Sequence, residues 1–306
     1  MSTEFFDLER LADTIEADLP ELEGNVRPLT LLGEGFMSWA VETPTGVVFR
    51  IPKRQRAAQR AEVERLFLAE LAPTLSIDVP SQTYHGPPSD LCPWGYSGYA
   101  KVPGAALDLS RMSPSAISRA AENLGKFFAA LHAFPLERAG ELGVLDNWRE
   151  EYLQLRGAVM PRLAKELTPQ EYGLVDSWWE EYLADGRNWN FAPAVVHGDV
   201  GPQHLLVSED GNLTGVIDFG EVMIGDPAVD FGGLVAYVSP AFAQAVLASY
   251  REHGGEPDAD VLRRGTTLAM AVPFFTVLIA VNSGEGHVPT VADGIAELRA
   301  GPILSD

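Results

Sequence analysis

Val195-Val-His-Gly-Asp199-Val-Gly-Pro-Gln-His204-Leu-Leu-Val207 is the most informative segment of this 306-residue chain, together with Gly215-Val-Ile-Asp218-Phe-Gly220, which follows it. Asp199 stands at the end of an apolar strand, and His204, a side chain able to bind metal, follows five residues later. Asp218 ends the next hydrophobic run. Phosphoryl transfer needs one carboxylate to accept a hydroxyl proton and further groups to hold the magnesium ions of a nucleoside triphosphate. The stretch therefore predicts a phosphotransferase.

The same residues resemble the catalytic loop of the kinase-like fold. Protein kinases carry His-Arg-Asp, four further residues, Asn and then Asp-Phe-Gly. The corresponding positions here hold His197-Gly198-Asp199, His204 and Asp218-Phe219-Gly220. His-Gly-Asp in this loop is typical of the antibiotic phosphotransferases. Histidine at the metal position, together with the segment Gly-Asp-Pro-Ala-Val-Asp-Phe at residues 225–231, is similar to the macrolide 2'-phosphotransferases.

This resemblance extends from the glycines near Gly33 to about Phe231 and implies an α+β, protein-kinase-like fold with two lobes. We expect a small β-rich N-lobe over residues 1–102 that binds the nucleotide. A larger, mainly helical C-lobe over residues 103–306 would hold the catalytic loop, the metal site and the acceptor pocket. The implied reaction transfers the γ-phosphate of GTP, with ATP as the alternative donor, to the 2'-hydroxyl of a macrolide amino sugar. Mg²⁺ is the implied cofactor.

Hydrophobic patterning is in keeping with this division. Apolar residues at helical spacing from Phe5 to Leu19 predict an amphipathic helix at the start of the chain, and Pro20 is expected to end it. Short apolar runs separated by glycine-containing turns predict strands at residues 27–32, 37–42 and 47–51, and a helix follows over 57–71. Helices dominate after residue 103, beginning with one that Ser113-Pro114 is expected to cap.

The glycine-containing turn Gly33-Glu-Gly35-Phe-Met-Ser38 lies between two predicted strands. Glycines there would let backbone amides approach triphosphate oxygens without an intervening side chain. Gly-x-Gly by itself is more often a simple hairpin turn. Its position ahead of the strand at residues 47–51 favours a nucleotide-binding role for Gly33, Gly35 and Ser38.

That strand carries the cation expected to pair with the α- and β-phosphates. Arg50 lies within the strand, whereas Lys53 follows a proline and remains the competing candidate. The next helix should supply the carboxylate that holds this cation. Glu62 is our first choice for that partner and Glu64 is the second.

The connector Tyr99-Ala100-Lys-Val102 precedes the lobe boundary, and the resemblance implies that its backbone hydrogen-bonds the purine edge. Contacts made by the backbone leave no trace in the sequence. The residues of this connector therefore do not distinguish ATP from GTP.

In the catalytic loop, Asp199 is the expected base, or the group that orients the attacking hydroxyl. His204 and Asp218 are the expected magnesium ligands, although a histidine ring is an unusual partner for a hard cation that prefers oxygen. His197 is expected to be a hydrogen-bonding partner within the loop and His132 a packed core residue. Asp230 is expected to brace the loop.

A macrolide is a large apolar ring with an amino sugar, so its pocket should combine a hydrophobic wall with a few acids. Chemistry alone nominates four acceptor-binding residues. Tyr237 follows the Gly225–Phe231 segment, and Phe274 and Phe275 could be exposed beside Pro273 at a helix irregularity. Asp226 could meet the ammonium of the sugar.

Composition limits the other partners. A net charge of −21 argues against nucleic acid, and 46% hydrophobic with 21% charged residues is an ordinary globular balance. The near-apolar run at residues 270–281 is shorter than the ~20 residues that a membrane span requires. A single cysteine and an acidic start without a signal-peptide pattern predict a cytoplasmic protein. We expect a monomer, although the sequence leaves the oligomeric state open.

The sequence also bears on three other functions. An aminoglycoside kinase, or another small-molecule hydroxyl kinase, is the first alternative, but its pocket should be lined by acids while the last third of the chain is notably apolar. A pseudokinase-like binding module would lack a base or a metal residue, yet Asp199 and Asp218 are both present. A protein kinase would carry an Ala-Pro-Glu segment after Asp218, and none follows.

Overall fold

The computed structural model describes residues 7–146, 148–283 and 289–305. It divides into two compact units, the first formed by Met1–Gly104 with Thr214–Gly220 and the second by Ala105–Leu213 with Glu221–Asp306. The expected N-lobe did not include Thr214–Gly220, and this part of the prediction is wrong. The Asp78 amide donates to the Thr214 carbonyl at 2.9 Å and the Val216 amide donates to the Asp78 carbonyl at 3.1 Å. These bonds attach the segment that carries Asp218 to the first unit.

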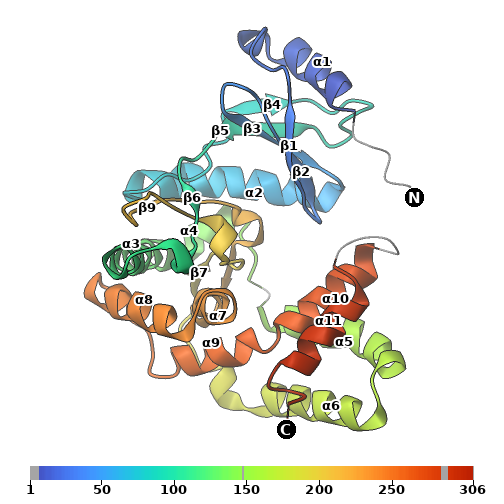
Figure 1. The fold of residues 1–306 in the computed structure, drawn as a ribbon, viewed down its shortest axis with the longest axis vertical. Coiled ribbons are helices and arrows are strands. Elements are labelled where there is room, and N and C mark those ends of the chain that lie inside the picture. Colours follow the sequence, from blue (N-terminus) through green and yellow to red (C-terminus); the bar gives the residue numbers. More distant parts are fainter. Residues whose placement is uncertain (1–6, 147, 284–288, 306) are drawn as a thin grey trace. The chain divides into compact units, whose positions relative to one another are not determined.

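The first unit is built on a five-stranded antiparallel sheet (Figure 1). Its strands, in spatial order, are β1 (Thr30–Glu34), β2 (Ser38–Glu42), β3 (Val47–Pro52), β5 (Tyr96–Ala100) and β4 (Tyr84–Gly86). Helices α1 (Leu8–Asp18) and α2 (Gln55–Leu71) lie on opposite sides of it (Figure 1). Short 3₁₀ turns follow each helix, at Pro20–Leu22 and Ala72–Thr74. The predicted helices and strands are confirmed over the described residues, with the first strand displaced toward the glycines. Phe5, the first residue of the predicted first helix, lies outside the described residues.

The register of the sheet decides which side chains face each helix. Val41 pairs with Phe49, and both are fully buried in the cluster that includes Leu11 of α1. Since neighbouring residues of a strand point to opposite faces, Arg50 lies on the other side, toward α2. The sheet therefore presents an apolar face to α1 and a cation to α2.

The second unit is mainly helical. Its helices are α3 (Pro114–His132), α4 (Leu136–Glu141), α5 (Trp148–Glu166), α6 (Pro169–Ala184), α7 (Ala228–Tyr237), α8 (Pro240–Glu252), α9 (Val261–Ala269), α10 (Val272–Ser283) and α11 (Val291–Ala300). Strand β7 (Ala194–Val196) pairs with β10 (Met223–Gly225), and β6 (Ala105–Ala106) pairs with β8 (Leu205–Val207). Strand β9 (Leu213–Val216) carries the chain from the second unit to the first. Single 3₁₀ turns lie at Leu109–Arg111, Gly186–Asn188, Pro202–His204 and Phe219–Glu221.

Local sequence signals account for several helix boundaries. Ser113 caps α3 by accepting a hydrogen bond from the Ala116 amide at 3.2 Å, as predicted. Thr168 and Glu171 form a capping box at the start of α6. Helix α3 packs closely on α8 because Gly125 has no side chain, and a Cβ there would lie 2.5 Å from the Cβ of Ser249.

Within the described residues, no single helix is long and apolar enough to cross a membrane. One pair, Val261–Ala269 with Val272–Asn282, passes that test when taken together but is bent by 41°.

Candidate functional site

Asp230 holds the backbone of the predicted catalytic loop. Its side chain is fully buried at the start of α7 and accepts the His197 amide on Oδ2 and the Gly198 amide on Oδ1, both at 3.0 Å. Nε2 of His132 also donates to Oδ2 at 3.0 Å, while Nδ1 of that ring faces the Tyr250 hydroxyl at 3.2 Å. The expectations that Asp230 braces the loop and that His132 is a packed core residue are confirmed.

Gly198 has a backbone conformation that the loop requires. Its φ is +83°, and a Cβ built on it would lie 2.3 Å from the Glu221 carbonyl oxygen. A larger residue would be strained by its φ and would also collide with backbone. This contact gives a physical reason for glycine between His197 and Asp199.

The loop also positions Asp199 and His204. Nδ1 of His197 accepts a hydrogen bond from the Asp199 amide at 3.2 Å, as expected for a partner within the loop. Nδ1 of His204 donates to the Asp199 carbonyl at 2.8 Å, so Nε2 is the ring nitrogen that carries the lone pair. The Asp199 carboxylate has 48% of its side-chain surface exposed. An imidazole fixed through Nδ1 and a nearby exposed carboxylate fit the donor set of a metal-dependent site.

In the first unit, Arg50 bridges two carboxylates. Its guanidinium lies 3.0 Å from Glu64 and 2.9 Å from Asp218. Burial disfavours the charged guanidinium, but the two carboxylates outweigh this effect and raise the pKa of Arg50. Burial raises the pKa of Glu64, whose side chain is 1% exposed, while Arg50 opposes that shift. The cluster is a fixed cation held between a buried and a half-exposed carboxylate.

Glu62, our first choice as the partner of Arg50, is not that partner. It forms an ion pair with Arg65 at 2.6 Å. Residues two apart on a helix are separated by about 200° around its axis, so Glu62 and Glu64 cannot face the same strand. The second choice, Glu64, takes the role.

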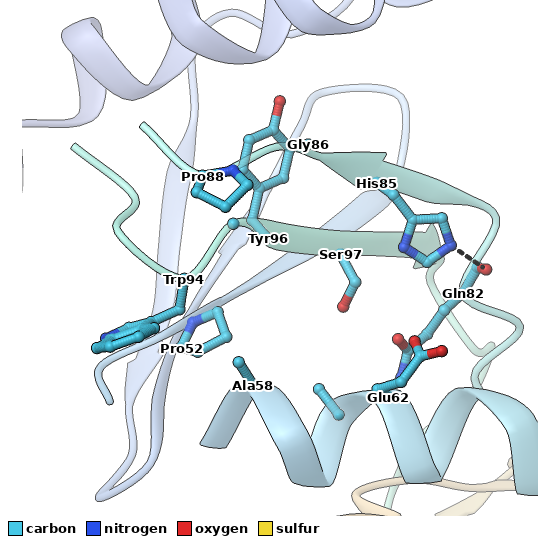
Figure 2. A pocket seen from close by; sticks show the side chains of 12 residues that line it. Pro52, Ala58, Glu62, Gln82, His85, Gly86, Pro88, Trp94, Tyr96 and Ser97 are labelled. Atoms are coloured by element: carbon cyan, nitrogen blue, oxygen red, sulfur yellow. Dashed lines mark hydrogen bonds between the residues drawn. The ribbon is translucent and has the colours of Figure 1, made fainter. Parts of the chain in front are cut away.

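Glu62 instead lines a cavity of about 180 Å³ between α2 and strands β4 and β5 (Figure 2). His85 and Gln82 also line the cavity, joined by a 3.1 Å hydrogen bond from Nε2 of His85 to the Gln82 carbonyl. The cavity is smaller than the roughly 300–1,000 Å³ of a typical ligand pocket. It is therefore not a candidate for nucleotide or antibiotic.

The competing cation, Lys53, is engaged elsewhere. Its ammonium pairs with Glu34 at 2.8 Å, at the end of β1. The structure thus brings Arg50, and not Lys53, to the carboxylates of Glu64 and Asp218.

Asp218 has an unusual backbone. Among the described residues it is the only one other than glycine with a positive φ, at 65°. Aspartate tolerates this left-handed region better than most residues, but the conformation still carries strain. Such strain occurs preferentially at functional sites. It is consistent with the metal-binding role expected for Asp218.

The glycine turn forms the short hairpin between β1 and β2. The Gly35 amide donates to the Ser38 carbonyl at 2.9 Å, and Gly33 follows an irregularity in the pairing of β1 with β2. This hairpin is compatible both with a phosphate-binding loop and with a simple turn, so the roles of Gly33, Gly35 and Ser38 stay predictions.

The connector after β5 is tied to the sheet. The Lys101 amide donates to the Gly46 carbonyl at 2.7 Å, and the Val102 side chain is buried. Burial raises the pKa of Tyr99 to about 12, and charges on Arg50, Glu64 and Asp218 also act on it. Tyr99 therefore lies within electrostatic reach of the Arg50 cluster, while nucleotide binding by Tyr99, Ala100 and Val102 stays a prediction.

Asp226 cannot meet a substrate ammonium as we expected. Its side chain is 1% exposed and accepts two hydrogen bonds from Arg264, at 2.6 and 2.9 Å, and one from the Ala228 amide at 2.9 Å. Burial raises the pKa of Asp226, although Arg264 opposes the shift. The residue belongs to a buried ion pair, which Asp258 extends by pairing with the same arginine at 2.8 Å.

The two neighbouring phenylalanines have different surroundings. Phe274 is fully buried, with its ring 4.9 Å from that of Trp179, so its expected exposure is wrong. Phe275 is 37% exposed and lies 5.9 Å from the ring of Tyr152. Helix α10 begins after the bend at residues 270–271. Because successive residues of a helix point about 100° apart, Phe274 faces the core while Phe275 is partly exposed.

The acceptor-binding role expected for Tyr237 stays a prediction. It ends α7, is 51% exposed, and has a pKa raised to about 12 by burial and by the charges of Asp199 and Glu297. Glu297, on α11, accepts a 2.8 Å hydrogen bond from the Thr276 hydroxyl. The sequence did not single out Glu297, because no motif surrounds this acidic residue on the last helix.

Glu64, in contrast, could have been ranked first from the sequence. The buried residues of α2 recur every three or four positions as Ala57, Arg60, Glu64, Phe67, Leu68 and Leu71. Glu62 is not among these buried residues. The helical period thus contained the signal that separates the two glutamates.

Comparisons with known proteins bear on both units. A model described as the phosphotransferase enzyme family matches residues 28–264. An uncharacterized protein, YcbJ, of Bacillus subtilis (strain 168) is 25% identical over 268 residues, covering 84% of this chain and 85% of that protein. A viomycin phosphotransferase of Streptomyces vinaceus is 31% identical over 109 residues, covering 35% of this chain and 36% of that enzyme.

Solved structures resemble the whole chain. The GDP and kanamycin complex of APH(2")-IIIa has a TM-score of 0.85 at 27% identity, with 95% of this chain and 97% of that one covered. The macrolide 2'-phosphotransferase MphH from Brachybacterium faecium has a TM-score of 0.68, also at 27% identity, with coverages of 96% and 98%. The expected kinase-like fold, with a small sheet-based lobe and a helical lobe, is confirmed.

Proposed function

The chain belongs to the phosphotransferase enzyme family, and we propose that it transfers the γ-phosphate of GTP, with ATP as the alternative donor, to the 2'-hydroxyl of a macrolide amino sugar. The observation that carries the phosphotransfer part is the Arg50 cluster. A guanidinium fixed by Glu64 next to Asp218 is what a kinase needs to orient a triphosphate and its metal.

We assign the donor nucleotide to the first unit. Arg50 would pair with its phosphates, the Gly33–Ser38 hairpin would offer backbone amides, and the Tyr99–Val102 connector would contact the purine. The favoured use of GTP rests on the resemblance to macrolide phosphotransferases, and the similar APH(2")-IIIa structure was determined with GDP.

His204 and Asp218 are the proposed ligands of Mg²⁺. The fixed Nδ1–H of His204 places the lone pair of its ring on Nε2, and Asp218 offers carboxylate oxygen, the ligand type that Mg²⁺ prefers. Bound Mg²⁺ would neutralise charge on the β- and γ-phosphates.

Asp199 is the proposed catalytic residue. His197 and His204 hold the backbone of Asp199 at its amide and at its carbonyl, which fixes the point in the loop from which the carboxylate extends. From there it would align the acceptor hydroxyl and take its proton. Positioning supplies much of the rate in phosphoryl transfer, so the carboxylate need not be strongly basic.

The acceptor is proposed to lie against Tyr237 and Phe275, which are exposed aromatic residues of the second unit. Exposed aromatic side chains suit the apolar ring of a macrolide. With Asp226 buried, Glu297 becomes the proposed acid for the dimethylammonium of the sugar, since its charge acts on Tyr237 together with that of Asp199.

An aminoglycoside acceptor is the second candidate, and one observation favours it. The TM-score of 0.85 to the kanamycin-bound structure exceeds the 0.68 to the macrolide enzyme at the same identity. That score compares backbones, whereas substrate choice depends on pocket side chains. The aromatic residues exposed here are the reason for ranking the macrolide first.

The test is a phosphate-transfer assay with a macrolide panel and an aminoglycoside panel, each with GTP and with ATP. We expect turnover with macrolides, and loss of at least ~10²-fold for Asp199→Ala with nucleotide affinity unchanged. His204→Asn should keep more activity than His204→Ala, because an amide oxygen can replace the imidazole as a ligand. Turnover confined to aminoglycosides would refute the macrolide assignment, and near-parental rates for Asp199→Ala would remove its catalytic role.

A further inference from the structure

The hairpin at Gly33–Ser38, here termed the glycine hairpin, is attached at its tip to the segment that follows Arg50. Lys53 lies at the start of the β3–α2 connection, and its ammonium pairs with Glu34 at 2.8 Å. The same ammonium sits 4.7 Å from the centre of the Trp39 ring, and the Lys53 amide donates to the Met37 carbonyl at 2.9 Å. One lysine therefore contacts both strands of the hairpin and its turn.

Arg54 adds a second attachment. Its guanidinium lies 4.3 Å from the centre of the Phe36 ring, and Nη2 donates to the Phe36 carbonyl at 3.4 Å. Glu34 and Phe36, on the hairpin, and Lys53 and Arg54, on the connection, form what we term the latch.

The latch joins two parts of the proposed nucleotide site. Arg50 points toward Glu64 and Asp218 from one end of a five-residue segment, while Lys53 and Arg54 hold the hairpin from the other end. A short turn containing Gly35 has many conformations in the absence of such contacts. Holding it in one of them reduces the ordering that binding would otherwise require.

We propose that Lys53 and Arg54 are positioning residues that keep the glycine hairpin closed over the phosphates of a bound nucleotide and so set its release rate. This inference rests on the proposed nucleotide site, but assigns Lys53 to the loop and not to the phosphates. Substitutions that break the latch should accelerate dissociation of the nucleotide more than its association. The contacts of the latch are made within the protein and not with the nucleotide.

A charge-swap experiment tests this. Dissociation of a fluorescent GDP analogue, chased with excess unlabelled GDP, is measured for the parent, Glu34→Lys, Lys53→Glu and the double variant. We expect each single change to accelerate release about fivefold, in line with a partly buried ion pair. The double variant should return to within about twofold of the parent.

A matched pair of neutral variants controls for net charge. Lys53→Met and Arg65→Met each remove one cation from the same region, but Arg65 pairs with Glu62 away from the hairpin. Only Lys53→Met should accelerate release and increase hydrogen exchange of the amides at residues 35–37. Thermal melts of all variants confirm that each is folded.

Several results would overturn the proposal. If Lys53 binds phosphate directly, Glu34→Lys should slow release while Lys53→Glu accelerates it, and the double variant should not recover. Unchanged release in both single variants would exclude the latch. Failure of the parent to phosphorylate any antibiotic, with nucleotide release still following the predicted pattern, would refute the proposed function and leave the latch supported.

Discussion

Glu64→Gln and Glu62→Gln form a matched pair that tests how the Arg50 cluster is held. The two residues lie on the same helix, two positions apart, and the changes are chemically identical. Glu64 is 1% exposed and holds Arg50, whereas Glu62 is 56% exposed and holds Arg65. Any difference between the variants therefore reports the environment and not the substitution.

The magnitude follows from burial. Removing one partner of a buried ion pair is destabilising by about 3–5 kcal/mol. Glutamine keeps a neutral hydrogen bond and Arg50 keeps Asp218, so we expect Glu64→Gln to lower the free energy of unfolding by about 2 kcal/mol. Exposed pairs contribute roughly 0–1 kcal/mol, so Glu62→Gln should change that free energy by about 0.5 kcal/mol or less.

Nucleotide binding gives the second measurement. Arg50 would lose one of the two contacts that fix its orientation, and we expect a weakening of about tenfold in Kd for Glu64→Gln, equivalent to ~1.4 kcal/mol. Urea unfolding and a fluorescent-nucleotide titration provide the two values for each variant. Equal effects for the two variants, or a larger effect for Glu62→Gln, would refute the assignment of Glu64 as the residue that orients Arg50.

Three further changes test the loop and the second unit. Asp230→Asn should lower the free energy of unfolding by about 2–4 kcal/mol in urea melts, because an amide cannot accept on both sides and its NH₂ would face backbone donors. Gly198→Ala should lower it by at least about 2 kcal/mol, since the φ of +83° and the 2.3 Å approach to the Glu221 carbonyl both oppose a Cβ. Glu171, whose pKa the hydrogen bond from Arg299 lowers to about 2, contributes stability that is present above pH 4.5 and lost as the pH falls toward 2. Glu171→Gln should therefore melt below the parent at pH 6, and an undiminished gap between them near pH 2 would contradict this.

The sequence sufficed to nominate the residues proposed to handle phosphate, because their placement depends on short segments. A carboxylate five residues before a metal-binding side chain is positioned by one loop, and the loop is recognisable when it is contiguous. Arg50 could be chosen over Lys53 because a strand residue has a defined direction while a residue after Pro52 does not. The prediction of Glu62 as the partner of Arg50 was wrong, although the helical period of the buried residues of α2 includes Glu64 and excludes Glu62.

Membership of the two units was not predictable from the order of the chain. Asp218 follows the catalytic loop in sequence, yet Thr214–Gly220 belongs to the first unit. The backbone bonds to Asp78 that attach it join positions more than a hundred residues apart. Backbone pairing of this kind depends on register and leaves no side-chain pattern to read.

Acceptor recognition was the least predictable part for a related reason. Whether Asp226 is available depends on Arg264, 38 residues later, and nothing near Asp226 in the sequence announces that partner. Exposure of Phe274 or Phe275 depends on where α10 begins, since a shift of one residue rotates a helix by about 100°. Phosphate chemistry is common to all kinases of this fold and is fixed by local motifs, whereas the proposed acceptor contacts are side chains on α7, α10 and α11 whose exposure is set by packing. The same physical difference explains why family membership follows from the sequence while the choice of antibiotic must be decided by assay.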